Sequence, residues 1–193
     1  MKLLETIYLK AGQLQNIDYH NQRFNTSRKV VFGKNETEDL MDLIPIPNEY
    51  QSENYRCRVI YEEEIESISF IKYVQKDIKN LKLVDIENWD YQHKYADRDF
   101  LNALLAQNSD VDEVIMTKNG FITDCTIANL AFWDGDNWFT PSTPLLKGTK
   151  RQQLLDKQLI AEREIRVDDI SQYEGVCLIN CFRNLELENL INI

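Results

Sequence analysis

The stretch GFITDCTIANLAFWDGDNWFTPSTPLLKGTKR, residues 120–151, decides the fold of this chain. It begins as an apolar strand that ends on one acid, Asp124, and a short polar run then leads to Asn129. A second pair of strands turns at the Asp-Gly-Asp run of residues 134–136, which is typical of a hairpin turn. The stretch therefore predicts a β-rich unit with a carboxylate at the end of a strand.

The same stretch closes on a predicted helix start. Pro141 and Pro144 precede it, and Gly148 is followed by Thr149, with Gln152 three residues further on. This is the spacing of a capping box, in which Thr149 and Gln152 satisfy backbone N–H groups at the helix start. A glycine and a hydroxyl at the positive end of a helix dipole can hold a phosphate, although most such caps hold no ligand.

Length and composition define the class of protein. The chain has 193 residues, of which 43% are hydrophobic, enough for one domain or two small lobes with a real core. Its formal charge of −10 argues against nucleic acid or an anionic membrane as a partner, because both attract basic surfaces. Residues 1–5 do not resemble a signal peptide, and no apolar run reaches membrane-spanning length, so we expect a cytoplasmic protein.

The cysteines and histidines do not form a metal-binding pattern. The four cysteines contain no C-x-x-C pair, and the two histidines do not flank them at the spacing of metal ligands. We expect reduced thiols in the core and no metal; a structural zinc and a cysteine nucleophile are the weaker alternatives. The cysteines are Cys57, Cys125, Cys177 and Cys181.

The rest of the chain alternates strand-like and helix-like segments. A charged, irregular run over residues 76–91 is the predicted boundary between a smaller lobe, residues 1–76, and a larger lobe, residues 77–193, which carries Lys94. Periodicity and breakers predict a hairpin over 3–15, a helix from Asn16 or Asp18 to Gly33, a helix from about 39 to Pro45, strands at 55–61, 65–73 and 81–84, a helix at 100–108, a helix at 150–157, an exposed strand at 160–166 and a buried strand at 176–182.

Two groups of basic residues could bind an anion. His20 and Arg23 form an H-x2-R element on the first long helix, where a polar stripe facing solvent is the simpler interpretation. Arg56 and Arg58 share one face of a strand by period two. Either arginine could be ordinary solvent-facing charge, but a guanidinium fits a carboxylate bidentately, and we favour Arg58 for that role.

Taken together, the string G-[hydrophobic]2-T-[acid]-C-T-x2-N-[hydrophobic], the tryptophan-rich hairpin and the later G-T-x-R resemble the class IV (fold type IV) pyridoxal-phosphate enzymes. That family includes branched-chain and D-amino-acid aminotransferases and 4-amino-4-deoxychorismate lyase. The resemblance implies a two-lobed α+β fold and a pyridoxal 5'-phosphate (PLP) cofactor. It also implies that Asp124 pairs with the pyridine nitrogen, where the family more usually has Glu. Because Glu5 and Thr6 match the E-[ST]-I element, before which family members usually carry one or two more strands, we expect a shortened N-terminal lobe.

The resemblance assigns further roles residue by residue. Lys94, thirty residues before Asp124, matches the lysine that holds the cofactor aldehyde, with His93 beside it as a packing residue. A surface lysine is the plain alternative. The remaining implied assignments are Arg23, Gly148 and Thr149 on the cofactor phosphate, Asn129 and Cys181 elsewhere around the cofactor, and Arg58 and Arg98 on the substrate.

Lys94 and Arg98 match the K-x3-R of the lyase branch, while Asp99 stands where branched-chain aminotransferases have a tyrosine, and Asn180-Cys181 also leans to the lyases. We therefore expect a lyase resembling 4-amino-4-deoxychorismate lyase, which eliminates pyruvate from aminodeoxychorismate to give p-aminobenzoate for folate synthesis. A class IV amino acid aminotransferase is the alternative, and an inactive binding protein on this fold is the second. The resemblance also implies a homodimer and a small amino substrate with carboxylates.

Overall fold

The computed structural model describes residues 1–193 and divides them into two compact units. The first unit comprises residues 1–75 and 93–97, and the second comprises residues 76–92 and 98–193. The boundary predicted from the sequence follows residue 76 and places Lys94 in the larger lobe. In the structure the segment 93–97 groups instead with the first unit, because the Leu4 amide donates to the Lys94 carbonyl at 2.8 Å and the Ala96 amide donates to the Lys2 carbonyl at 2.9 Å.

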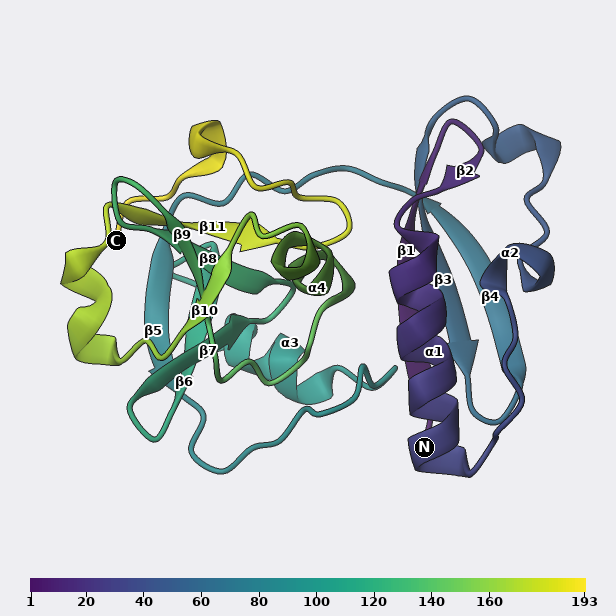
Figure 1. Cartoon of the computed structure of the whole chain (residues 1–193), viewed down its shortest axis with the longest axis horizontal. Helices are drawn as coiled ribbons and strands as arrows, with labels where there is room; N and C mark the ends of the chain where they lie inside the picture. The colour runs from purple at the N-terminus through teal and green to yellow at the C-terminus, as the bar shows by residue number, and fades with distance from the viewer. The chain divides into compact units, whose positions relative to one another are not determined.

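The first unit is a four-stranded antiparallel sheet in the order β2-β1-β3-β4 (Figure 1). Helix α1 lies across this sheet and ends at Gly33, whose φ of 75° is the left-handed conformation that glycine adopts without strain. The elements are β1 (Leu3–Lys10), β2 (Gln13–Leu14), α1 (Ile17–Phe32), α2 (Leu40–Leu43), a 3-10 turn (Asn48–Tyr50), β3 (Asn54–Tyr61) and β4 (Ile65–Lys72).

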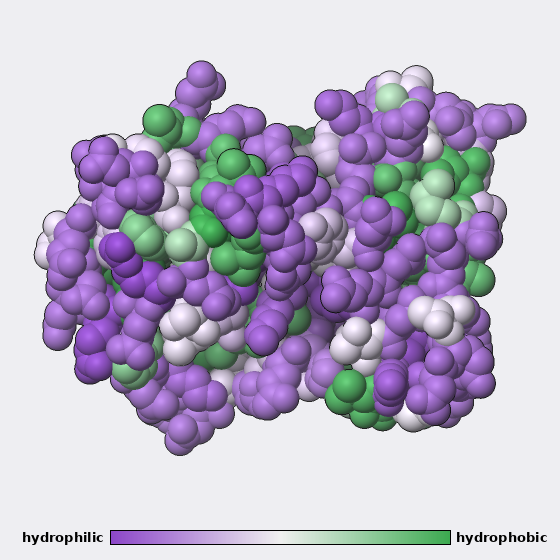
Figure 2. All heavy atoms as spheres, viewed as in Figure 1, coloured by the Kyte–Doolittle hydropathy of each residue, from purple (hydrophilic) through white to green (hydrophobic).

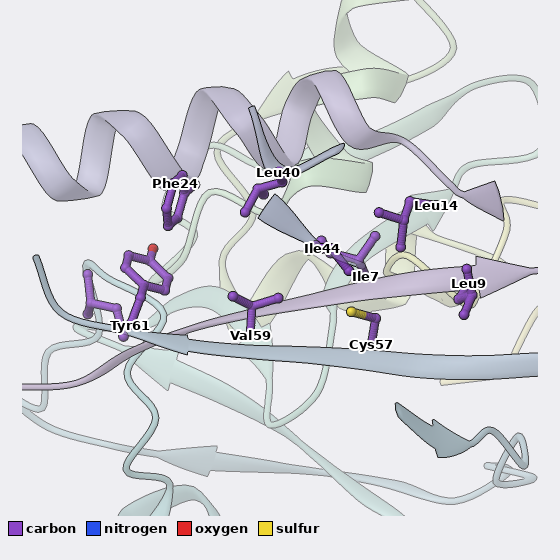
Figure 3. Close-up of a cluster of buried hydrophobic side chains, with 10 residues drawn as sticks. Ile7, Leu9, Leu14, Phe24, Leu40, Ile44, Cys57, Val59 and Tyr61 are labelled. Atoms are coloured by element: carbon purple, nitrogen blue, oxygen red, sulfur yellow. The ribbon is translucent and has the colours of Figure 1, made fainter. Parts of the chain in front are cut away.

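The core of the first unit lies between the helices and the inner face of the sheet. Phe24 and Leu40 point from the helices toward Val59 and Tyr61 of β3, and all four are almost fully buried (Figure 3). The rings of Phe24 and Tyr61 meet edge to face, with centroids 4.7 Å apart. This packing follows from the alternation of β1 and β3, which turns every second side chain toward α1.

The second unit contains two sheets, in the orders β5-β6-β7 and β10-β9-β8-β11. Two helices make crossovers between parallel strands: α3 connects β5 to β6, and α4 connects β9 to β10. The elements are β5 (Leu81–Asp85), α3 (Asp99–Ala106), β6 (Glu113–Lys118), β7 (Phe121–Cys125), β8 (Asn129–Trp133), β9 (Trp138–Pro141), α4 (Thr149–Asp156), β10 (Ala161–Arg163), a 3-10 helix (Val167–Gln172), β11 (Gly175–Ile179) and a 3-10 turn (Leu187–Asn189).

The predicted α+β class and its helices and strands are confirmed, with one correction at the start of α4. The N-cap of α4 is Gly148, and Thr149 is its first helical residue. The Gln152 side chain reaches forward to the Asp156 carboxylate at 2.8 Å. The predicted capping box of Thr149 and Gln152 is therefore wrong, because the helix starts one residue earlier than the pattern suggested.

The surface and the thiols agree with the composition. Hydrophobic residues appear on the face in Figure 2 in scattered groups among hydrophilic ones. All four cysteines are free, and Cys57, Cys125 and Cys177 are buried. No helix has both the length and the apolar character needed to cross a membrane.

The core of the first unit makes one stability prediction. Replacing Phe24 with Ala removes a fully buried ring and leaves a cavity beside Tyr61. We expect the free energy of unfolding to fall by about 3–5 kcal/mol, measured by urea denaturation followed by circular dichroism. Val30→Ala is the control, because Val30 lies on the same helix with 66% of its surface exposed; its free energy of unfolding should change by less than about 0.5 kcal/mol. A similar loss in both variants would contradict this prediction.

Candidate active site

Asp124 lies buried at the end of β7, held by two uncharged donors. Its Oδ1 accepts a hydrogen bond from Asn129 Nδ2 at 2.6 Å, and its Oδ2 accepts one from the Leu146 amide at 2.9 Å. Burial raises the pKa of Asp124 to about 6, although these donors oppose the shift. The carboxylate is therefore mostly ionised at neutral pH. Its hydrogen-bond donors are uncharged, and the positive charge of the buried Arg151 also opposes the rise in its pKa.

A β-bulge aims this carboxylate. The register between β6 and β7 shifts between Ile115 and Thr117, so Thr123 and Asp124 together face Met116. Such an extra residue bends a strand and redirects its side chains, and bulges are common beside functional sites. Simple alternation in the sequence could not predict this change of direction.

Asn129 connects the acid to the start of α4. Its Nδ2 also donates to the Leu146 carbonyl at 2.8 Å. A Cβ on Gly148 would lie 2.0 Å from Asn129 Oδ1, so residue 148 must be a glycine for this approach. Asp124, Asn129, Gly148 and Thr149 therefore lie together, and the first amides of α4, which have no partner within the helix, belong to the same cluster.

The loop 125–128 brings two more predicted residues to this cluster. Arg98, at the N-cap of α3, donates from Nη2 to the Thr126 carbonyl at 2.8 Å. Asn180 Nδ2 donates to the Ile127 carbonyl at 3.1 Å, and Cys181 follows it, close enough to Lys150 at the start of α4 to affect the pKa of that lysine. The second unit thus gathers Arg98, Asp124, Asn129, Gly148 and Thr149 near one loop, and Cys181 follows Asn180, which is bonded to that loop.

In the first unit, the predicted arginine and histidine meet on a buried acid. Glu5 has none of its surface exposed, and its Oε1 accepts from Arg23 Nε at 2.7 Å. Glu5 Oε2 accepts from Arg23 Nη2 at 2.5 Å and lies 2.6 Å from His20 Nδ1. Burial alone would raise the pKa of Glu5, but Arg23 and His20 outweigh it and lower the pKa to about 2. Glu5 is therefore an anion, and His20 Nδ1 is assigned as the donor.

Lys94 lies beside this group. Its carbonyl accepts the Leu4 amide, next to Glu5, and its charge contributes to lowering the pKa of His20, after burial and Arg23. The alternative of a plain polar stripe, which the position of the H-x2-R element before the main string already disfavours, does not fit the structure, since His20 is fully buried and Arg23 is bound to Glu5.

Arg58 lies in the middle of β3, paired with Thr6 and Ser69 of the neighbouring strands. It is half-buried, and its side chain makes no hydrogen bond or ion pair within the chain. Arg56 shares its face, with its guanidinium 5.7 Å from the ring centroid of Tyr73. Arg58 is therefore the arginine of this strand whose charge is not used inside the first unit, as a residue that binds an external anion requires.

Sequence reasoning missed the role of Glu5. The signal was present, because Glu5 alternates with Leu3 and Ile7, which are both fully buried, on the face of β1 that packs against α1. A charged residue at such a position needs a buried partner, and the H-x2-R element on the next helix was the available one.

The donor set fits PLP in its chemistry. The aldehyde needs an amine, the pyridine nitrogen needs a carboxylate, and the phosphate needs N–H donors. In the first unit, Lys94 could supply the amine and Arg23 a donor for phosphate. In the second unit, the Asp124 carboxylate, whose own donors are uncharged, could supply the anion that a pyridinium would stabilise, and the α4 amides could supply donors for phosphate.

The raised pKa of Asp124 predicts a pH dependence of stability. Because the folded-state pKa of about 6 exceeds the ordinary 3.8, ionisation destabilises the folded state as pH rises from about 4 to about 6. Asp124→Asn does not ionise, so the variant should gain roughly 3 kcal/mol of unfolding free energy relative to wild type across that window. Urea titrations from pH 4 to pH 7 measure it, and Asp136→Asn, at an exposed turn, controls for the exchange itself. A pH-independent difference for Asp124→Asn would contradict the prediction.

Known proteins resemble this chain over nearly its whole length. A Haemophilus influenzae protein named only as uncharacterized is 37% identical over 185 residues, which are 95% of this chain and 98% of that one. A provisionally named aminodeoxychorismate lyase of Schizosaccharomyces pombe is 37% identical over 86 residues, which are 42% of this chain and 37% of the relative.

Solved structures agree with these relatives. The crystal structure of a provisionally named 4-amino-4-deoxychorismate lyase from Haemophilus somnus 129pt is similar with a TM-score of 0.89 and 36% identity, over 95% of this chain and 97% of that one. A PLP-bound aminotransferase from Mycobacterium tuberculosis shares the fold with a TM-score of 0.72 at 18% identity, over 93% and 77% of the two chains.

Residues 2–185 match the family described as amino-transferase class IV, which spans both units and all the residues discussed above. The predicted resemblance and the two-lobed fold type IV architecture are confirmed. With this match and the Haemophilus relatives, the chain belongs to the class IV amino-transferase family.

Proposed function

We propose that this protein is a PLP-dependent lyase that eliminates pyruvate from aminodeoxychorismate to give p-aminobenzoate for folate synthesis. The observation that carries the proposal is the Asp124 cluster of the second unit, a buried carboxylate held only by uncharged donors beside the start of α4. The choice of a lyase is supported by Arg98 four residues after Lys94, by Asp99, by Asn180-Cys181, and by the 36% identity to the Haemophilus somnus protein.

Each role falls to a side chain whose chemistry fits it. When bound, PLP supplies an electron sink for the carbanion formed at the amino-bearing carbon of a substrate. Lys94 holds the cofactor aldehyde and moves a proton, which requires its neutral amine. Asp124 holds the proton on the ring nitrogen. Arg23 and the amides of Gly148 and Thr149 bind the phosphate, with Glu5 orienting Arg23 through two hydrogen bonds.

Substrate recognition falls to arginines. A dicarboxylic substrate must find local positive charge on a chain whose formal net charge is −10. The Arg58 side chain is uncommitted within the first unit, and in the second Arg98 donates to the Thr126 carbonyl on the loop that follows Asp124. Both guanidinium groups can bind a carboxylate bidentately. We propose that they orient the substrate, with Asn129 and Cys181 contributing around the cofactor.

A class IV amino acid aminotransferase is the second candidate, favoured by the family itself. It would use the same lysine and acid but leave the amino group on the cofactor for a keto acid. An inactive binding protein on this fold is the third. For any of these functions we propose a cytoplasmic homodimer, on the basis of the family resemblance.

Cofactor binding is tested by a spectrum. The wild-type protein mixed with PLP should acquire a visible absorbance band that differs from free PLP, and Lys94→Ala should lose that band because it lacks the amine. Lys82→Ala is the matched control, because Lys82 is an exposed lysine of β5, and it should keep the wild-type spectrum. A wild-type protein that takes up no PLP would support the binding protein and exclude both enzymes.

Product analysis separates the lyase from the aminotransferase. With aminodeoxychorismate, the lyase should release p-aminobenzoate and pyruvate in equal amounts, and Lys94→Ala should reduce the rate by at least a thousandfold. In a parallel assay, an amino acid alone should not convert the cofactor persistently to its pyridoxamine form. Persistent conversion that a keto acid reverses, without p-aminobenzoate production, would identify the aminotransferase instead.

A further inference from the structure

Glu113, at the start of β6, is a second buried acid of the second unit and has no role so far. Only 1% of its surface is exposed. Its Oε1 accepts the Val114 amide at 2.9 Å and the Thr126 amide at 3.2 Å, and its Oε2 accepts the Thr126 hydroxyl at 2.9 Å. A carboxylate buried among uncharged donors is costly unless its hydrogen bonds are made, so Glu113 and Thr126 depend on each other.

Thr126 is bonded on both sides. Its amide and hydroxyl go to Glu113, while its carbonyl accepts Arg98 Nη2 at 2.8 Å. It lies two residues after Asp124, on the loop that runs to Asn129, and Asn129 returns to donate to Asp124. Asp124 and its donor Asn129 thus lie at the two ends of a short loop, and Glu113 and Arg98 fix the middle of that loop.

This arrangement restricts the bulge of β7. Asp124 leaves the regular ladder at the bulge, so pairing with β6 does not by itself set the direction of its side chain. The bonds at Thr126 supply the missing constraint on the C-terminal side. On the other side of Asp124, the Thr123 hydroxyl donates to the Met116 carbonyl at 2.7 Å. This bond joins β7 to β6 and does not involve the loop.

We propose that Glu113 is a positioning residue, which fixes loop 125–128 through Thr126 and so holds Asp124 and Arg98 in place for cofactor and substrate. The inference rests on the proposed function, in which Asp124 meets the cofactor ring and Arg98 meets the substrate. Glu113 itself touches neither.

The test compares four full-length variants: Glu113→Ala, Glu113→Gln, Thr126→Val and Thr123→Val. Hydrogen exchange of a peptide covering residues 121–130 reports the loop in the protein as purified, and a titration with PLP gives the dissociation constant. Glu113→Ala should speed exchange in the loop at least tenfold and weaken PLP binding at least tenfold, because the Thr126 amide and hydroxyl lose their acceptors. Thr126→Val, which loses only the hydroxyl, should change both in the same direction by a smaller factor.

Two variants separate positioning from general stability. Glu113→Gln should restore wild-type exchange and PLP affinity to within about threefold, because the amide oxygen still accepts and the Thr126 hydroxyl can turn to accept from the new NH2 group. Thr123→Val also removes one buried hydroxyl bond, in β7 and three residues before Thr126, yet it should leave loop exchange and PLP affinity within twofold of wild type.

Several outcomes would overturn the proposal. Unchanged hydrogen exchange of the loop in Glu113→Ala would contradict the positioning role. Faster loop exchange with unaltered PLP affinity would also contradict it, because Glu113 would then have a purely structural role. If Glu113→Ala does not fold, Thr126→Val is compared with Thr123→Val instead. Equal effects of these two variants on loop exchange and PLP affinity would reject the positioning role of Glu113. A wild-type protein without PLP uptake removes the proposed function and this proposal with it, whereas uptake that Glu113→Ala leaves intact removes this proposal alone.

Discussion

Buried carboxylates, and the donors that hold them, are the constraint on which the rest of this structure depends. Glu5, Glu113 and Asp124 all lie in the interior, where an ionised acid is stable only if hydrogen bonds or a cation replace its water. Glu5 has Arg23 and His20, and its pKa falls to about 2. Asp124 has only an amide side chain and backbone amides, and its pKa rises to about 6. The difference lies in the donors: a guanidinium is hydrogen-bonded to Glu5, whereas the donors to Asp124 are uncharged and the positive charge of Arg151 offsets the effect of burial only in part.

The fold of each unit supplies these donors locally. In the first unit, α1 packs against β1 so that its H-x2-R element reaches an acid on the inner face of the strand, while the outer-face Arg58 stays uncommitted. In the second unit, a bulge, a loop and the start of a helix converge on Asp124, and a glycine at 148 admits Asn129 between them. In the second unit, regular elements form the framework, and Asp124 and its donors lie at the irregular points between them.

Local patterns predicted most of the framework, because periodicity, Gly33 and the prolines are local signals that act on neighbouring residues. The sequence also identified Asp124, Asn129 and Gly148 as one string, although not their contacts. What failed depends on distant residues. The capping box predicted at Thr149 was wrong because Gly148 is the N-cap of the helix. Gly148 packs against Asn129, nineteen residues earlier, and a rule that considers only neighbouring residues cannot predict this contact. The same reason explains two other errors. The role of Glu5 depends on its bond to Arg23, and the place of Lys94 in the first unit depends on its bond to Leu4; both bonds join residues far apart in the sequence.

The pKa values also explain how an aspartate can serve where the family usually has glutamate. At pH 7 a carboxyl with a pKa near 6 is mostly ionised, and keeping it charged in this buried position costs roughly 3 kcal/mol relative to water. That cost is recovered when a positive group such as a pyridinium arrives, so the strain of the uncompensated charge becomes binding energy for a protonated ring. The buried Arg151 of the second unit lowers the pKa of Asp124 only in part, whereas Arg23, hydrogen-bonded to Glu5, helps to lower the pKa of Glu5 to about 2. In the proposed role, a pyridinium would therefore still meet a carboxylate that the chain has not fully compensated, held in place by the uncharged Asn129.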